Sequence, residues 1–362
     1  MELALYCPLY GFYEREQDII GRRGEFYTSV SVGKFFGELL AWQFADWLGE
    51  AVVGANTITN YQDESGQLSS PSLQLVEAGA HDGRLAKDII SWHKENRPAL
   101  FERLDYWIIE PSARRRLWQE KTLRDFGGKV HWISDLEKLS RIHKNGITGI
   151  IFSNEFLDSF PVHRLGWDQN RRDWFAWGVT IRDGDFCWAR IENQGLDIRA
   201  PAGHTSILSV LSSNVLTNEL TIEVCPAAAE WWAAAARLLQ RGRILTFDYG
   251  CSAEELLVPE RAQGTLRAYR GHHVGHDLLA APGDQDLTAH VNFSVIQAAG
   301  ESAGLHTETF VTQEQFLTRI FAQTCNTQLG FGEWTPERTR QFKTLIHPDH
   351  LGRVFRVLVQ AR

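Results

Sequence analysis

The amino-acid sequence predicts an α/β fold built on a mostly parallel, Rossmann-like sheet. Between residues 73 and 154, short apolar runs typical of buried strands alternate with segments of helical periodicity. This alternation indicates a parallel sheet with helices on both faces, because parallel strands need a crossover connection. Two of the predicted strands end on an acidic residue, and a glycine-containing bend follows the first. Ligands of such sheets bind at these strand ends.

Changes of composition and hydrophobic pattern along the chain divide it into segments. Residues 1–50 predict an N-terminal segment with a loop that covers the ligand. Residues 73–250 predict the Rossmann-like core, with a hairpin insertion around 162–220, where aromatic and β-branched runs flank the turn RDGD. Residues 251–362 mix a long loop with helical patterns and end in a further core strand. The polar, turn-rich residues 54–72 are expected to form an exposed connection.

Bulk composition fits a large globular protein. The chain has 362 residues, of which 43% are hydrophobic and 23% charged, and its net charge is −8. This length can bury a large core, and the negative charge gives no electrostatic basis for binding nucleic acid. No basic stripe accompanies the 13 tryptophans, so these are expected to pack in the core or a lid instead of stacking on bases.

The cysteines and the start of the chain bear on the compartment. The five cysteines are far apart in the sequence and form no CxxC pair. This pattern predicts a reducing compartment, the cytoplasm, with neither disulfides nor structural zinc. No apolar stretch reaches the ~18 residues of a membrane helix. Residues 1–16 show neither the apolar core of a signal peptide nor an Arg-rich transit pattern.

The most informative segment is LQLVEAGAHDGRLAKDII, which predicts a strand, a bend and a helix. Glycine is used where the backbone turns sharply or approaches a ligand, and the helix that follows offers free N–H groups. A dinucleotide loop requires GxGxxG, whereas this spacing resembles the ExGxGxG loop of class I S-adenosylmethionine (SAM) methyltransferases. Glu77, Gly79 and Gly83 are therefore candidate cofactor-binding residues. The alternative is a tight turn with a structural role alone.

A second acidic strand end supports a nucleoside ligand. The apolar run YWII stops at Glu110, and Pro111 is expected at the first position of the next helix. In nucleotide-binding folds, an acid at the end of the next strand accepts hydrogen bonds from ribose hydroxyls. Glu110 is therefore a candidate ribose ligand. In the alternative interpretation it only interacts favourably with the N-terminus of the helix.

The segment SNEFLDSFP, residues 153–161, is the candidate for the chemical step. It follows an apolar strand, so Asn154, Glu155 and Asp158 are expected beside the cofactor, with Asn154 among its ligands. If the methyl acceptor is a guanidinium, Glu155 and Asp158 can hold it by bidentate hydrogen bonds and leave one nitrogen directed at the methyl group. In the alternative interpretation, Asn154 caps a helix whose first turn contains both acids.

Histidines supply the remaining candidates. His290 in TAHVNF is either a hydrogen-bond partner in the active site, where we place it among the catalytic residues, or an interior histidine. The segment HHVGH, with His272, His273 and His276, lacks the carboxylate spacing of a metal site. No metal is therefore predicted.

Taken together, these motifs are similar to those of the MidA-type methyltransferase family, which includes a mitochondrial complex I assembly factor that dimethylates an arginine. The matching segments are YGFY, GEFYTSVSVGKFFGELLA, LVEAGAHDGRLAKDI, IIEPSARRRLWQ, SNEFLDSFPVHR, EVCP, GRILTFDYG, GTLRAYRGH and PGDQDLTAHVNFS. The resemblance implies a class I SAM fold with an inserted or appended helical and hairpin substructure, SAM as cofactor and a protein arginine as substrate. It also implies that Gly79, Gly83 and Glu110 hold SAM. Thr28 and Ser29 would lie near it, and the NEFLD acids would face the substrate.

The sequence departs from the family's pattern in the glycine bend. Ala80 and His81 stand where the family usually has proline and the middle glycine. The side chain of His81 is expected either to crowd the methionine part of SAM or to point to solvent if its φ is negative. Two other functions therefore stay open: a binding or assembly factor that keeps the fold without turnover, and methylation of a small molecule.

Overall fold

The computed structural model describes residues 1–15, 28–56, 72–191, 220–270, 273–275, 277–326, 331 and 333–362. The chain divides into two units, each assembled from separate stretches. The hairpin unit is Met1–Tyr27, Leu157–Ala233 and Tyr249–Ser302, and the sheet unit is Thr28–Phe156, Ala234–Asp248 and Ala303–Arg362. Both units combine stretches that the sequence pattern assigned to different segments.

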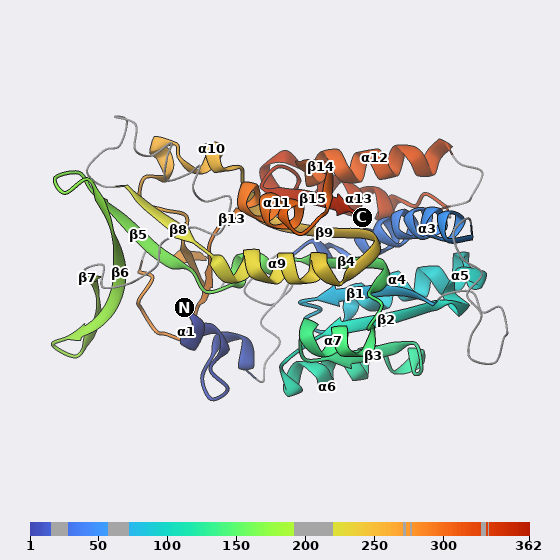
Figure 1. The fold of residues 1–362 in the computed structure, drawn as a ribbon, viewed down its shortest axis with the longest axis horizontal. Helices are drawn as coiled ribbons and strands as arrows, with labels where there is room; N and C mark the ends of the chain where they lie inside the picture. Colours follow the sequence, from blue (N-terminus) through green and yellow to red (C-terminus); the bar gives the residue numbers. More distant parts are fainter. Residues whose placement is uncertain are drawn as a thin grey trace. The chain divides into compact units, whose positions relative to one another are not determined.

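The sheet unit is built on strands in the order β14-β15-β9-β4-β1-β2-β3 (Figure 1). Neighbouring strands from β3 to β9 pair in parallel, as the strand–helix alternation predicts. The strands are β1 (Leu73–Ala78), β2 (Leu104–Ile109), β3 (Val130–Ile133), β4 (Ile147–Asn154), β9 (Leu239–Cys251), β14 (His306–Thr312) and β15 (Phe355–Ala361).

Helices follow most of these strands. The helices α3, α12 and α13 pack on one another, and α4 packs on α3 (Figure 1). The helices of this unit are α2 (Ser29–Val32), α3 (Phe35–Asn56), α4 (Arg84–Asn96), α5 (Pro98–Glu102), α6 (Ala113–Thr122), α7 (Leu136–Ile142), α12 (Gln313–Asn326) and α13 (Pro336–Ile346).

The central strand β1 explains where the site lies. All six of its residues are buried, since strands β4 and β2 flank it and helices cover the sheet. Ala78 at its end pairs with Ile109 of β2 on one side and with Ser153 of β4 on the other. The carboxyl ends of these three parallel strands therefore meet at one edge of the sheet, where ligands of open α/β sheets bind.

The last two strands of this sheet differ in how well the sequence predicts them. The expected final core strand is β15, confirmed within the sheet. Its antiparallel neighbour β14 was not predicted. The segment HTETFVT alternates threonine with other residues and has only partly exposed or exposed side chains, so it lacks the apolar run by which the buried strands were found.

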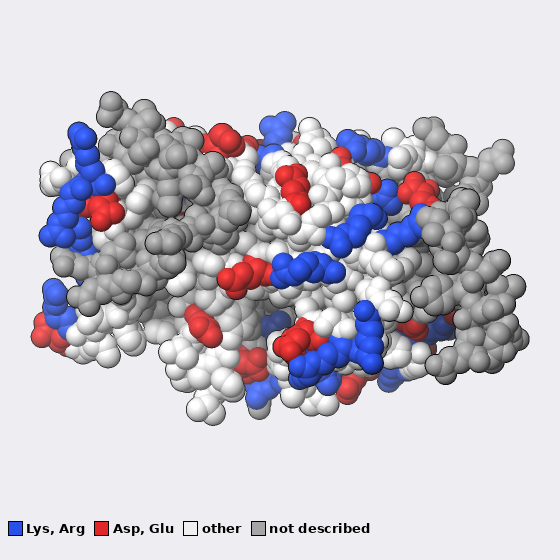
Figure 2. All heavy atoms as spheres, in the orientation of Figure 1, with Lys and Arg blue, Asp and Glu red and all other residues white. Residues whose placement is uncertain are grey.

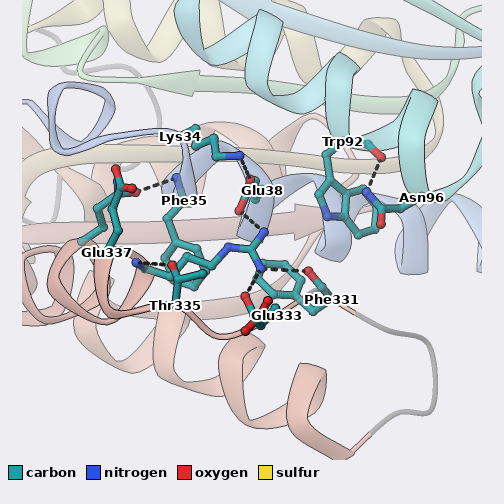
Figure 3. Close-up of polar contacts among 11 residues, drawn as sticks. Lys34, Phe35, Glu38, Trp92, Asn96, Phe331, Glu333, Thr335 and Glu337 are labelled. Atoms are coloured by element: carbon teal, nitrogen blue, oxygen red, sulfur yellow. Dashed lines mark hydrogen bonds and ion pairs between the residues drawn. The ribbon is translucent and has the colours of Figure 1, made fainter.

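A buried ion pair fastens α13 to α3 (Figure 3). Arg338 donates to Oε2 of Glu38 at 2.8 Å, and both side chains are mostly buried. The same guanidinium donates to the carbonyl oxygens of Phe331 at 3.4 Å and Glu333 at 2.7 Å. Lys34 pairs with the other oxygen of Glu38 at 3.1 Å. This network fixes the C-terminal helix against the helix that leads into β1.

The hairpin unit contains two smaller sheets, ordered β7-β6-β5-β8 and β11-β10-β12. The hairpin expected around Asp183 and Gly184 is confirmed, because β6 and β7 pair in an antiparallel manner across this turn. The short strand β13 and the helices α1, α9, α10 and α11 also belong to the described part of the unit. The elements are α1 (Glu2–Tyr6), β5 (His163–Asp168), β6 (Asp173–Arg182), β7 (Asp185–Ile191), β8 (Thr221–Val224), α9 (Pro226–Leu238, which ends in the sheet unit), α10 (Ala253–Leu256), β10 (Arg267–Arg270), β11 (His273–Gly275), β12 (Asp286–Thr288), β13 (Val291–Asn292) and α11 (Phe293–Ser302).

Some expectations lie wholly or partly outside the described residues. They concern His272, His276, residues 57–71 of the expected connection and residues 192–219 of the expected hairpin insertion. Among the described residues, no cluster of His, Cys, Asp or Glu could hold a metal ion, and no helix is long and apolar enough to cross a membrane. On the face drawn in Figure 2, acidic and basic side chains are interspersed over the described surface.

Candidate functional site

The glycine bend follows β1 directly. Gly79 has a φ of 75°, and a Cβ on it would lie 2.9 Å from the ring of Phe156. Gly83 has a φ of 82° and is the N-cap of α4. Both positions therefore require glycine, the first for space and conformation and the second for conformation. Arg84 at the start of α4 donates its backbone N–H to Asp82.

His81 occupies the middle of the bend with a φ of 48°. The alternative in which a negative φ turns its side chain to solvent is therefore wrong. Its ring lies 6.1 Å from that of Trp118 in an edge-on arrangement, and Nδ1 is 3.8 Å from Asp82. His81 thus has a left-handed backbone conformation that glycine adopts freely, while its ring lies beside Trp118 of α6.

Glu77 is a buried carboxyl group within β1. The hydroxyl of Tyr106 in β2 donates to its Oε2 at 2.7 Å. Burial raises the pKa of Glu77 to about 8, although the Tyr106 hydrogen bond opposes this rise and nearby Asp82 adds to it. Tyr106 was not identified from the sequence, because its role depends on the register between two strands.

Glu110 comes directly after β2 and is 4% exposed. Its Oε1 accepts from the backbone N–H of Ser112, and its Oε2 accepts from Nε2 of Gln119, both at 2.9 Å. The helix α6 begins at Ala113 with Ser112 as N-cap, so the expectation of Pro111 as its first residue is wrong. Serine caps this helix more effectively than the proline could begin it, because its side chain accepts from Arg115.

Asn154 and Glu155 stand at the end of β4. Glu155 has a φ of 52°. Its Oε1 accepts from the backbone N–H of Ser29 at 3.1 Å and from Nδ2 of Asn154 at 2.9 Å. Burial raises the pKa of this carboxyl group to about 8, while both hydrogen bonds oppose the rise and Asp248 adds to it. Asn154 ends a strand, so the interpretation of Asn154 as a helix N-cap is wrong.

The oxygen of the Asn154 amide is a buried acceptor. This atom, Oδ1, accepts no hydrogen bond from the described part of the protein. A buried acceptor without a donor costs free energy, about 1–3 kcal/mol. The N–H or ammonium group of a ligand at this edge would satisfy it. Thr28 and Ser29 lie at the same edge, since Ser29 contacts Glu155.

Asp158 lies in the hairpin unit, within the short 3-10 helix Leu157–Ser159, and is 6% exposed. Its carbonyl oxygen accepts from the N–H of Ala289, just after β12. The phenol of Tyr13 is hydrogen-bonded to Asp286 of β12. Burial raises the pKa of this phenol well above its usual range, and the charges of Asp286 and Asp158 add to the rise. Asp158 and Asp286 therefore lie near the same phenol, and Asp286 was not singled out from the sequence.

His290 is in the hairpin unit as well. Its backbone N–H donates to Oγ1 of Thr265. The backbone N–H and the hydroxyl of Thr265 in turn donate to Oε2 of Glu223. Nδ1 lies 3.8 Å from the thiol of Cys251. Burial lowers the pKa of His290 to about 4, and the positive charges of Arg261 and Arg267 lower it further. The imidazole is therefore neutral at physiological pH.

The described edge of the sheet unit fits a nucleoside attached to an amino acid. Gly79 and Gly83 give the bend its left-handed turns directly after β1, and Glu110 presents a buried carboxylate at the next strand end. Each carboxylate oxygen can accept more than one hydrogen bond, so Glu110 can bind hydroxyls while it keeps its protein partners. The Oδ1 atom of Asn154 offers a further acceptor.

Comparison with known families agrees with this chemistry. Residues 52–311 match the model of a family described as "Putative S-adenosyl-L-methionine-dependent methyltransferase". This match covers more than half of the chain and confirms the resemblance drawn from the motifs.

Curated relatives are also methyltransferases by name. The chain is 27% identical over 326 residues to "Protein arginine methyltransferase NDUFAF7, mitochondrial" of Danio rerio, which covers 82% of this chain and 66% of that protein. The protein of the same name from Mus musculus is 28% identical over 335 residues, with 84% and 66% covered. The chain thus spans just under two thirds of the length of these two relatives.

A solved structure shares the fold. A protein of Burkholderia thailandensis, crystallised with S-adenosyl-homocysteine bound, has a TM-score of 0.79 and 26% identity to this chain. The likeness covers 100% of this chain and 86% of the other. The native structure of a Burkholderia thailandensis protein has a TM-score of 0.75 and the same 26% identity. The predicted SAM-type fold is therefore confirmed.

Proposed function

The chain belongs to this family of SAM-dependent methyltransferases, and on that premise we propose that it transfers methyl groups to an arginine side chain of a protein. The names of the curated relatives support the arginine substrate. The observation that carries the proposal is the combination of the glycine bend with Glu110 and Glu155, the acids that follow β2 and β4. A role in assembling a respiratory complex, which the motif resemblance implies, is part of the same proposal.

The proposed cofactor site is the carboxyl edge of the sheet unit. SAM supplies a methyl group on a positively charged sulfur. Glu110 is proposed to accept hydrogen bonds from the ribose hydroxyls, and Oδ1 of Asn154 to accept one from the amino-acid part. The backbone at Gly79 and Gly83 gives the ligand close access, and Glu77 stands beneath this bend within β1. Thr28 and Ser29 border the site through the contact of Ser29 with Glu155.

The proposed substrate ligands are carboxylates. A guanidinium is a planar cation that stays charged at physiological pH, and carboxylates bind it by paired hydrogen bonds. Glu155 and Asp158, three residues apart in the chain, are the carboxylates proposed to hold it. Because Oε1 of Glu155 already accepts two hydrogen bonds, its Oε2 is the atom proposed for the substrate. His290, whose imidazole is neutral, is proposed to act in the active site as a hydrogen-bond partner and not as a charged acid.

Asp158→Asn tests the substrate assignment. The variant keeps the shape of the side chain but loses the charge that orients a guanidinium, so we expect methyl transfer to fall at least ~100-fold while the dissociation constant for SAM changes less than ~3-fold. Calorimetry measures SAM binding, and labelled SAM measures transfer into a protein extract from cells that lack the gene. The control is Asp185→Asn, which removes an exposed acid in the same unit. Full transfer by Asp158→Asn would contradict the assignment.

The proposal that the protein is cytoplasmic rests on its cysteine thiols. None of the five cysteines forms a disulfide, which fits a reducing environment such as the cytoplasm. The curated relatives are named as mitochondrial proteins. Fractionation of cells that express the full-length tagged protein distinguishes the two compartments: recovery with cytosolic markers supports the cytoplasm, and recovery with mitochondrial markers rejects it.

A further inference from the structure

The first turn of α2 is held by a side chain from a distant part of the sheet unit. Ser29, its first residue, is fully buried and donates its backbone N–H to Oε1 of Glu155 at 3.1 Å. The first N–H groups of a helix have no partner within the helix, so an external acceptor stabilises them. The side-chain oxygens of Thr28 and Ser31 each accept from the backbone N–H of the other residue. Glu155 accepts from the backbone N–H of Ser29.

A second contact holds the same residue from the C-terminal part of the unit. The hydroxyl of Ser29 donates to Oε1 of Gln313 at 3.1 Å, and Nε2 of Gln313 donates to the carbonyl oxygen of Leu345 at 2.9 Å. Gln313 is fully buried at the start of α12. Glu155 therefore connects the end of β4 to a residue that α12 and α13 also hold.

These contacts lie at the edge of the sheet where the cofactor is placed. Ser153 pairs with Ala78, so Asn154, the last residue of β4, and Glu155 after it lie where the glycine bend follows β1. Phe156, the next residue, packs against Gly79. Glu155, which fixes the start of α2, therefore lies in the chain between two residues of this edge. They are Asn154, a proposed ligand of SAM, and Phe156, whose ring packs on the bend.

Glu155 occupies this place at an energetic cost. Its φ of 52° is unfavourable for a residue other than glycine. Its carboxyl group is also buried near Asp248, a like charge on β9. Strained residues persist where the surrounding structure holds them, and they cluster at sites of function. A glycine would relieve the backbone strain, but it would lose the acceptor for Ser29.

We propose that Glu155 is a positioning residue for the cofactor: its Oε1 fastens the start of α2 to the carboxyl ends of β1 and β4, and the affinity for SAM depends on this attachment. The inference deepens the proposed function at its cofactor site. It requires SAM binding, which follows from the family, and it does not require that the substrate is arginine.

Two substitutions separate the acceptor from the charge. Glu155→Gly removes the acceptor and relieves the positive φ, so the variant is expected to fold with unchanged or higher thermal stability. Glu155→Gln keeps an acceptor oxygen in the same place and loses the charge. We expect Glu155→Gly to weaken SAM binding about 10-fold, or ~1.4 kcal/mol. We expect Glu155→Gln to change SAM binding less than ~3-fold.

Hydrogen exchange of the SAM-free protein gives a readout that needs no cofactor. The amide of Ser29 is expected to exchange at least ~10-fold faster in Glu155→Gly than in the wild type, and at the wild-type rate in Glu155→Gln. The amides of β3, which this contact does not touch, serve as the internal control. A general loss of stability would instead accelerate exchange in both segments.

Three outcomes overturn the proposal. The first is unchanged SAM affinity in Glu155→Gly, and the second is unchanged exchange of Ser29 in the same variant. The third is equal loss of affinity in the Gly and Gln variants, which would assign the effect to the charge. Since no methyl acceptor is present, a wild type that binds SAM but does not methylate arginine would reject the proposed function and leave this inference standing.

Discussion

His81 and Glu155 both hold left-handed backbone conformations, with φ values of 48° and 52°, at the two strand ends that border the proposed cofactor site. Residues with a Cβ adopt this region at a cost, because the Cβ approaches the following carbonyl oxygen. His81 gains a ring contact with Trp118, and Glu155 gains hydrogen bonds. The departure from glycine at position 81 therefore changes the side chain on the bend while the backbone path stays glycine-like.

His81→Gly and His81→Ala test this conclusion. Both variants lose the ring, but only glycine adopts the required φ freely, so we expect the glycine variant to be more stable than the alanine variant by about 1 kcal/mol. Chemical denaturation measures this difference. SAM affinity is expected to stay within ~3-fold of the wild type in His81→Gly, because the ring rests against Trp118. A strong gain in affinity would show instead that the ring crowds the ligand.

Glu110→Ala tests the ribose assignment. Loss of the acceptor is expected to weaken SAM binding by about 1–3 kcal/mol, the cost of leaving a buried hydroxyl unsatisfied. Gln119→Ala is the matched control, since it removes the hydrogen bond to Glu110 but keeps the carboxylate. Calorimetry on both variants decides the matter. Equal losses in the two variants would assign Glu110 a structural role in the bend alone.

Local sequence was sufficient to find the residues at the strand ends. Glu110 and Asn154 follow apolar runs, and Gly79 and Gly83 have a distinctive spacing. Gln119 could not be found in this way. It is fully buried and donates to both Glu110 and the carbonyl oxygen of His81, two contacts that arise only when α6 folds back on the bend.

At the scale of elements, α13 depends on one cation. Arg338→Ala removes the more buried of two cations that pair with Glu38 and leaves this mostly buried carboxylate with the exposed Lys34, so we expect the free energy of unfolding to fall by about 3 kcal/mol. Arg340→Ala, on the exposed side of the same helix, is expected to change it by less than about 0.5 kcal/mol. Urea denaturation of both variants provides the comparison. Similar stabilities would show that packing of α13 alone holds it in place.

The elements of the chain were predicted unevenly for physical reasons. Strands β1, β2 and β4 are largely buried runs that the sequence predicts. By contrast, the start of α6 was displaced by two residues because Ser112 caps the helix after Pro111. The NEFLD segment forms a 3-10 turn where a capped helix was one alternative, since Asn154 remains paired within β4.

At the scale of the whole molecule, stability is expected to depend on pH through Glu77. Its pKa in the folded protein is about 8, above the usual value of 4.5, so the folded state binds a proton that the unfolded state releases. The stabilisation is complete below pH 4.5 and is lost as the pH rises through about 8. The melting temperature of Glu77→Gln should therefore fall less between pH 6 and pH 9 than that of the wild type. An identical fall in both proteins would refute the assignment.

The division into two units was beyond what periodicity can predict. Each unit gathers stretches separated by many residues, and the chain passes between the units at Phe156 and Leu157, inside the NEFLD motif. Sequence patterns report local structure, whereas this division depends on which distant segments pack together. The crossing falls inside the NEFLD motif, so Glu155 belongs to one unit and Asp158 to the other.

The most direct test identifies the residue that accepts the methyl group. Purified protein is incubated with labelled SAM and a protein extract from the source organism that lacks this gene, and mass spectrometry locates the label. We expect the label on the guanidinium nitrogens of an arginine in a protein, and its near absence with Asp158→Asn. Label on lysine, on a carboxylate or on a small metabolite would contradict the arginine assignment. SAM binding without any transferred label would indicate an assembly factor without turnover.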